Sequence, residues 1–163
     1  MPNEFNANDI FEMAIKIEQN GAIFYRDAAQ HLDKENQKSF LLELAAMEDA
    51  HELTFSSMQK ELNEDAMAST TFDPDDENAL YLKALADTKV FFKKEEPDNT
   101  FKSILGCAIQ AEKDSIAFYL GMKELIPKKS GQSKIDDIIK EEMKHIRLLA
   151  DKLSEHYIFL ASI

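Results

Sequence analysis

The sequence has few of the residues that would favour a disulfide-bonded, irregular or strand-rich protein. Its 163 residues include one cysteine, Cys107, four glycines, four prolines and no tryptophan. A single thiol excludes an intramolecular disulfide and a thiolate cluster within one chain. Scarce glycine and proline, beside abundant Ala, Leu, Ile, Glu and Lys, favour an all-α protein, which we expect to form one domain over residues 1–163.

Basic residues and long apolar runs are also scarce. The chain has 19 Lys and Arg against 31 Asp and Glu, which gives a formal net charge of −12. We expect no nucleic-acid or membrane partner, because an acidic surface is repelled by phosphate groups and anionic lipids. No stretch approaches the roughly 20 apolar residues of a membrane span. The first residues lack the features of a secretory signal, so we expect a cytoplasmic protein.

Apolar residues recur with a period of 3.6 in four long segments, which predicts four helices. The first helix is expected to open at Asp9, with Glu12 completing a capping box. Turns are predicted at 32–34 and 127–131, and a long connection at 63–97, with a breaker at 73–76 and a short helical pattern through Val90. Two helical hairpins joined by a long crossover that contains a short helix form a ferritin-like four-helix bundle.

One motif occurs twice, and the second copy lies 94 residues after the first. It consists of a Glu, a Tyr seven residues later, and a Glu-x-x-His, all on the apolar helical stripes. The first copy is Glu18, Tyr25, Glu48 and His51, and the second is Glu112, Tyr119, Glu142 and His145. A carboxylate on one helix and a Glu-x-x-His on the next, doubled, is the ligand set of a di-iron or di-manganese bundle.

The six Glu and His residues of this repeat form a candidate metal site on faces otherwise made of Ile, Leu, Phe and Ala. An isolated carboxylate in such an interior is strongly destabilising or becomes protonated. Two divalent metals carry a charge that balances four carboxylates beside neutral imidazoles. Glu and His without thiolates suit iron or manganese, with zinc as an alternative by affinity.

The role of the two tyrosines stays open between two interpretations. Tyr25 and Tyr119 lie two helical turns beyond their Glu residues on the same faces. Each hydroxyl could hydrogen-bond a metal-ligating carboxylate and orient it. Alternatively, each is a core aromatic residue whose hydroxyl reaches solvent.

Residues outside the repeat are expected to have ordinary structural roles. Four acidic neighbours are expected at the surface, namely Asp49, Glu52, Asp114 and Glu141, and four methionines in the core, namely Met47, Met58, Met122 and Met143. The apolar segment Tyr157–Ile163 is too short to cross a bilayer. We expect it to pack on the bundle or on a partner subunit.

The doubled motif resembles that of rubrerythrin, a ferritin-like di-iron protein, and the resemblance covers nearly the whole chain. It implies that the six Glu and His residues bind two iron ions. Segment 78–87 looks like the crossover of rubrerythrin-like proteins that lack the rubredoxin part. There are two departures: rubrerythrins commonly end in a rubredoxin-like domain with four cysteines, and Ser115 stands where rubrerythrin has a further Glu.

The resemblance implies an oxidoreductase that reduces hydrogen peroxide or O₂ in oxidative-stress defence. Electrons would then come from a separate donor such as a rubredoxin. Two alternatives remain: non-enzymatic iron handling, as a ferroxidase or an iron buffer, and a retained fold with structural or adventitious zinc. We also expect a homodimer, since the long connection could exchange hairpins between two chains.

Overall fold

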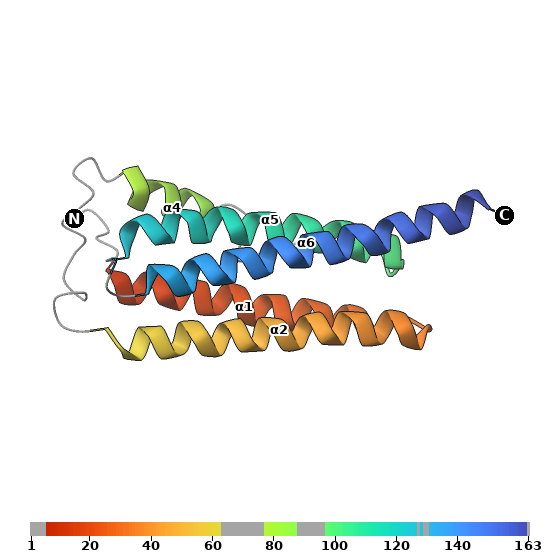
Figure 1. The fold of residues 1–163 in the computed structure, drawn as a ribbon, viewed down its shortest axis with the longest axis horizontal. Helices are drawn as coiled ribbons and strands as arrows, with labels where there is room; N and C mark the ends of the chain where they lie inside the picture. Colours follow the sequence, from red (N-terminus) through yellow and green to blue (C-terminus); the bar gives the residue numbers. More distant parts are fainter. Residues whose placement is uncertain (1–5, 63–76, 88–96, 127, 129–130, 163) are drawn as a thin grey trace.

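The computed structural model describes residues 6–62, 77–87, 97–126, 128 and 131–162. These residues form five α-helices and no strand: α1 (Ala7–Gln30), α2 (Glu35–Lys60), α4 (Glu77–Asp87), α5 (Phe101–Leu125) and α6 (Gln132–Ala161). α1 packs along α2, α5 along α6, and the short α4 lies on α5 (Figure 1). The prediction of two helical hairpins and a short intervening helix is therefore confirmed. The predicted breaker at 73–76 and Val90 lie outside the described residues.

The first helix begins two residues before the predicted start. Asn6 is its N-cap: its side-chain oxygen accepts a hydrogen bond from the Asp9 backbone N–H at 3.0 Å, and the Asp9 carboxylate accepts one from the Asn6 N–H at 3.1 Å. The capping box predicted for Asp9 and Glu12 was therefore wrong, because Asp9 is the third helical residue rather than the cap. Glu12 instead accepts a hydrogen bond from the Asn8 side chain at 3.1 Å.

Short connections make the helices of each hairpin antiparallel. Between α1 and α2 the predicted turn is present, and Leu32 is buried beneath it. Gly131 is the N-cap residue directly before α6. Its φ is +105°, a left-handed conformation that favours glycine. The Gln132 side chain donates to the carbonyls of Lys123 at 2.9 Å and Ile126 at 2.8 Å, which satisfies acceptors that the end of α5 leaves open.

The apolar core consists of two clusters, one toward each end of the bundle. One contains Phe11, Phe55, Met58, Phe118 and Ile135 among others, and the other contains Leu41, Leu44, Ile104, Leu105 and Leu149 among others. The charged residues of the repeat are buried as well but belong to neither cluster. The bundle therefore has a polar interior layer with apolar packing at both ends.

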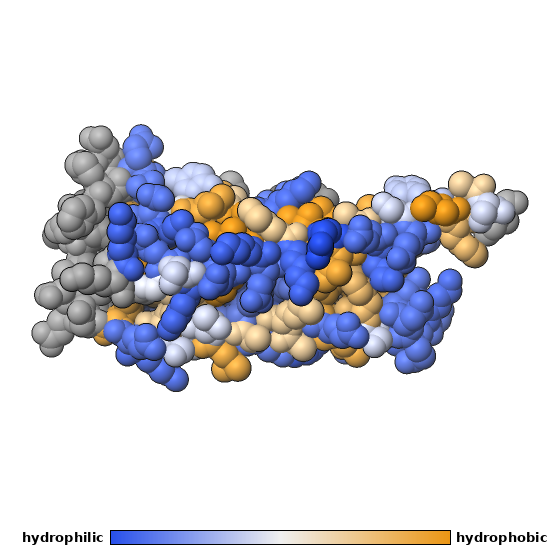
Figure 2. Space-filling model, in the orientation of Figure 1, coloured by the Kyte–Doolittle hydropathy of each residue, from blue (hydrophilic) through white to orange (hydrophobic). Residues whose placement is uncertain are grey.

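The last turns of α6 project beyond the other helices (Figure 1), and hydrophobic residues gather on this projecting end (Figure 2). Tyr157, Ile158, Phe159 and Leu160 are exposed, with exposed fractions from 49% to 71%. Two of these side chains still lie near the bundle, because Lys102 Nζ is 4.8 Å from the centre of the Tyr157 ring and Lys34 Nζ is 6.0 Å from that of Phe159. The tail therefore contacts its own bundle on one face only, and packing on a partner stays a prediction. Ile163 lies outside the described residues.

One of the predicted core methionines lies at the surface. Met143 is 53% exposed, because it directly follows the buried Glu142 and the helical rotation carries it away from the bundle. Met58 and Met122 are buried, as predicted. In the described part of the chain, no helix has the length and apolar character needed to cross a membrane.

The left-handed conformation of Gly131 gives a test of the second hairpin. We expect Gly131→Ala to lower the free energy of unfolding by about 1–2 kcal/mol, because an L-residue is strained at this φ. A Cβ there would also lie 2.8 Å from the Met58 methyl carbon. Gly106, in α5, is the matched control: nothing lies within 4 Å of its Cβ position, so Gly106→Ala should stabilise by about 0.5–1 kcal/mol. Urea denaturation measures the free energy of unfolding of both variants. Equal changes in the two would contradict the left-handed conformation at Gly131.

Candidate metal centre

The six Glu and His residues of the repeat meet in the polar layer of the bundle. α1 supplies Glu18, α5 supplies Glu112, and α2 and α6 each supply a Glu-x-x-His pair. The i, i+3 spacing places the Glu and His of each pair on one helix face. Each of the six is at most 4% exposed. The structure therefore brings together all six residues that the sequence singled out.

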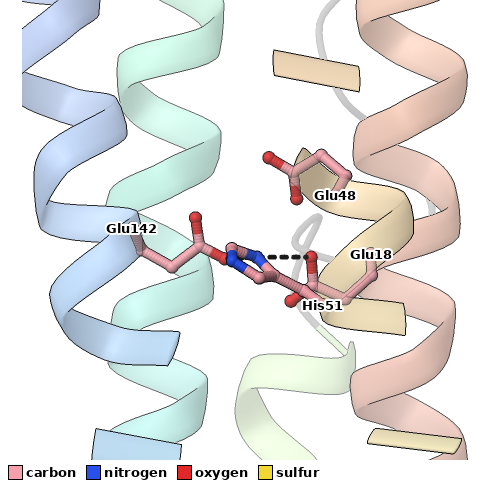
Figure 3. A group of neighbouring side chains, drawn as sticks. All are labelled: Glu18, Glu48, His51 and Glu142. Carbon is pink, nitrogen blue, oxygen red and sulfur yellow. Dashed lines mark ion pairs between the residues drawn. The ribbon is translucent and has the colours of Figure 1, made fainter. Parts of the chain in front are cut away.

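The cluster divides into two groups of potential ligands. One group contains Glu18, Glu48, His51 and Glu142, and the other contains Glu48, Glu112, Glu142 and His145. Within each group, one atom from every residue lies within 4.8 Å of all the others. The first group comes from α1, α2 and α6, and Figure 3 shows its side chains pointing toward one another. Because Glu48 and Glu142 belong to both groups, the arrangement suits two neighbouring metals that share two carboxylates.

Both imidazoles present the same nitrogen to the carboxylates. His51 Nδ1 lies 3.2 Å from Glu142 Oε1 and 3.5 Å from Glu18 Oε2. His145 Nδ1 lies 2.9 Å from Glu142 Oε2 and 3.3 Å from Glu48 Oε1. The two rings are stacked, with centroids 5.5 Å apart. Nδ1 is therefore the atom of each histidine that faces the buried carboxylates.

Several buried atoms of this cluster have no well-formed hydrogen bond to any described residue. They are Glu18 Oε2, Glu48 Oε1, Glu142 Oε2, both Nδ1 atoms, and His145 Nε2. The Nδ1 atoms lie near carboxylate oxygens, at 3.2 Å for His51 and 2.9 Å for His145, without forming a hydrogen bond. Buried polar atoms are normally paired, and metal coordination would satisfy the inward-facing oxygens and Nδ1 atoms. The donor set and its unpaired atoms thus fit a two-metal site.

Without metal, protons supply the positive charge in the layer. Burial and the charges of Glu112 and Glu48 raise the pKa of Glu142 to about 7. Burial opposes the charged form of His51, but the nearby carboxylates of Glu142 and Glu18 favour it more strongly and raise its pKa to about 11. In the same way, contacts with Glu112, Glu142 and Glu48 outweigh burial and raise the pKa of His145 to about 12. Metal binding must therefore displace protons from these residues.

Both tyrosine hydroxyls of the repeat bond to carboxylates of the cluster, and each bond joins the two hairpins. The Tyr25 hydroxyl donates to Glu112 Oε1, and the Tyr119 hydroxyl donates to Glu18 Oε1. Both tyrosines are buried, and burial, followed by the nearby carboxylate charge, raises each phenol pKa well above its ordinary value. Each hydroxyl therefore stays protonated and holds a carboxylate of the opposite hairpin. The alternative of a solvated hydroxyl was wrong.

The acidic neighbours lie outside the cluster, but one of them contacts it. Asp49 pairs with Arg26, Glu52 accepts from Gln19 at 2.8 Å, and Asp114 accepts from Gln110 at 2.9 Å. Glu141 is exposed, as predicted, yet its Oε2 lies 2.9 Å from His51 Nε2. The sequence did not reveal this contact, because Glu141 is not part of the repeated motif. The residue that corresponds to it 94 positions earlier is Met47.

Gly21 is a second residue whose importance the sequence did not reveal. A Cβ at this position would lie 3.1 Å from Glu48 Oε2, so a side chain here would press on a carboxylate of the cluster. Gly21 is followed 94 residues later by Ser115, which is also small. The Ser115 hydroxyl donates to the Ala111 carbonyl at 3.0 Å and so does not bond to the cluster.

Comparison with known proteins agrees with this geometry. No family model matches the chain, and no curated protein matches its sequence. Among solved structures, it is similar to a Thermotoga maritima protein provisionally described as a ferritin-like diiron-carboxylate protein. The two are 28% identical, the alignment covers 96% of this chain and 99% of the other, and the TM-score is 0.69.

The fold is thus an all-α, ferritin-like four-helix bundle, as the sequence predicted. This similarity and the buried carboxylate–histidine cluster support a place for the chain in the ferritin-like di-iron superfamily. Both also fit a site for two metal ions.

The two overlapping groups predict different effects for two substitutions. Glu48→Ala should remove both metals, because Glu48 belongs to both groups, whereas His51→Ala should remove about one metal per chain. Metal analysis after anaerobic loading with Fe(II) and desalting measures the content. Glu52→Ala is the matched control on α2 and should retain two metals. Two metals retained by a Glu18→Ala/Glu112→Ala double variant would rule out the assignment.

The raised pKa values predict that the metal-free protein loses stability as the pH rises. The folded pKa of Glu142 is about 7 against an ordinary 4.5, and that of His51 is about 11 against 6.5. The folded state therefore binds more protons than the unfolded state between pH 5 and 9. Each extra proton makes the free energy of unfolding fall by about 1.4 kcal/mol per pH unit.

Calorimetry of the metal-free protein across this pH range should show a falling Tm. Metal-bound ligands are already deprotonated, so the rise in Tm on adding Mn(II) should be larger at pH 8 than at pH 6. His51→Gln should flatten the pH dependence, and His31→Gln, altered outside the cluster, should not. A metal-free Tm that rises from pH 6 to 8 would contradict the protonation scheme.

Proposed function

We propose that this chain is a rubrerythrin-like di-iron oxidoreductase that reduces hydrogen peroxide or O₂ in oxidative-stress defence. Its electrons would come from a separate donor such as a rubredoxin. The observation that carries the proposal is the pair of ligand groups sharing Glu48 and Glu142. The description of the Thermotoga maritima protein as diiron-carboxylate supports iron as the metal, with manganese or zinc as alternatives.

The groups suggest a distinct role for each residue. Glu48 and Glu142 belong to both groups and would help to hold both metals, Glu18 and His51 would help to hold one, and Glu112 and His145 the other. When bound, two Fe(II) ions would supply the two electrons that, with two protons, convert hydrogen peroxide into two water molecules. Tyr25 would hold the carboxylate of Glu112 in place, and Tyr119 that of Glu18.

A narrow cavity beside the cluster suits a small oxidant. It adjoins Glu48 and Glu112, is lined by Gly21, Tyr25 and Ser115 among others, and leaves about 10 Å³ for the centre of a water-sized molecule. This is about the space that one water molecule needs. The two apolar clusters on either side of the layer exclude bulk water. A large organic substrate would not fit this cavity.

A ferroxidase or iron-buffering role is the second candidate. The net charge of −12 favours it, because an acidic protein concentrates cations near its surface. The same six residues would then bind iron as cargo. Catalytic consumption of peroxide with an added reductant distinguishes the two roles, because a buffer reacts only once per metal bound.

A second copy of this chain is the protein partner that we propose. The exposed residues from Tyr157 to Leu160 support it, since an apolar helix end in water gains stability from burial. Lys102 Nζ lies 4.8 Å from the centre of the Tyr157 ring, so one face of the tail already contacts the bundle. Whether hairpins exchange between the copies depends on the connection at 63–76 and 88–96, outside the described residues.

The reduced protein should react with an oxidant within seconds. Stopped-flow mixing of the anaerobic Fe(II) form with hydrogen peroxide or O₂ should produce a diferric absorption band. Ser115 replaces a rubrerythrin glutamate, so we expect a lower ratio of peroxide rate to O₂ rate than in that family, and Ser115→Glu should raise the ratio. Glu48→Ala, loaded identically, is the control for loosely bound iron. If neither oxidant generates a band, the enzymatic proposal fails, and iron storage or a structural metal takes its place.

A further inference from the structure

The two histidines of the cluster differ on the side that faces away from the carboxylates. His51 Nε2 lies 2.9 Å from Glu141 Oε2, whereas His145 Nε2 is buried and has no hydrogen-bond partner among the described residues. Both rings turn Nδ1 toward the carboxylates of the cluster, His51 toward Glu18 and Glu142 and His145 toward Glu48, Glu112 and Glu142. On the outer side, Nε2 has a carboxylate partner at His51 and none among the described residues at His145.

The repeat explains the origin of this asymmetry. Glu141 precedes Glu142 on α6, and the residue that precedes Glu48 on α2 is Met47. A thioether is a weak acceptor with no charge and cannot replace a carboxylate as a partner for an imidazole N–H. The sequence is thus doubled in its metal-facing residues but not in this supporting position.

The hydrogen-bond partner of Nε2 decides which tautomer of the imidazole can bind a metal. A neutral histidine that binds metal through Nδ1 must carry its proton on Nε2. For His51 this N–H can donate to Glu141, which fixes the ring orientation and increases the basicity of Nδ1. For His145 the same tautomer leaves a buried N–H without an acceptor in the described part of the chain. Metal binding is therefore better prepared at His51.

We propose that Glu141 is a positioning residue for His51, and that the position formed with Glu18 and His51 therefore binds metal more tightly than the position formed with Glu112 and His145. The inference rests on the metal centre of the proposed function but not on its reaction. It predicts an ordered uptake, in which the first metal occupies the His51 position.

Titration with Co(II), followed by visible absorption and calorimetry, tests the order. The unaltered protein should bind two Co(II) in two resolved steps; His51→Ala should lose the tighter step and His145→Ala the weaker one. Glu141→Ala should weaken the tighter step by about 10- to 100-fold and leave the weaker step unchanged. Glu141→Gln keeps an acceptor oxygen and should restore part of the affinity. Glu43→Ala, at an exposed glutamate of α2, is the control.

A second measurement reports the hydrogen bond itself. In the Zn(II)-loaded protein, ¹H–¹⁵N NMR should show a slowly exchanging Nε2–H on His51, and this signal should exchange faster in Glu141→Ala. Circular dichroism shows whether each variant keeps its helices.

Three results would overturn the inference: two equal Co(II) steps, a Glu141→Ala isotherm identical to that of Glu43→Ala, or a Glu141→Gln defect as large as that of Glu141→Ala. A different result would disprove the metal centre itself: Co(II) uptake would be absent, or it would be unaffected by Glu48→Ala.

Discussion

The structure depends on the burial of four carboxylates in the middle of an apolar bundle. Glu18, Glu48, Glu112 and Glu142 are each at most 4% exposed, and apolar clusters close the layer at both ends. Such a layer is unstable without positive charge, because buried carboxylates repel each other and lose their hydration. In the metal-free protein, protons on the histidines and on Glu142 supply part of that charge. Two divalent metals would supply all of it.

The same layer of buried carboxylates also joins the two hairpins. The layer is complete only when α1 and α2 meet α5 and α6, because each ligand group draws residues from both hairpins. The tyrosines strengthen the junction, since Tyr25 bonds to Glu112 and Tyr119 to Glu18. Metal binding would therefore be coupled to the docking of the hairpins, as in proteins whose sites do not exist in the unfolded chain.

The internal repeat sets a two-fold arrangement of the six Glu and His residues, and their neighbours depart from it. Glu141 supports one histidine, and Met47 takes the corresponding place beside the other. Gly21 and Ser115 are both small, so the cavity beside Glu48 and Glu112 stays open to a small molecule. The exposed apolar residues at the end of α6 lie away from the polar layer.

The sequence alone determined the helices, their pairing and all six residues of the cluster, because helical periodicity is local and the motif is repeated at a fixed distance of 94 residues. Only the tertiary structure decided which atoms meet across the hairpins: the bonds from Tyr25 and Tyr119 to the opposite carboxylates, the sharing of Glu48 and Glu142, and the contact between Glu141 and His51. These depend on how far each helix is rotated and shifted against its neighbours. That packing is set by the whole core, and no local pattern encodes it.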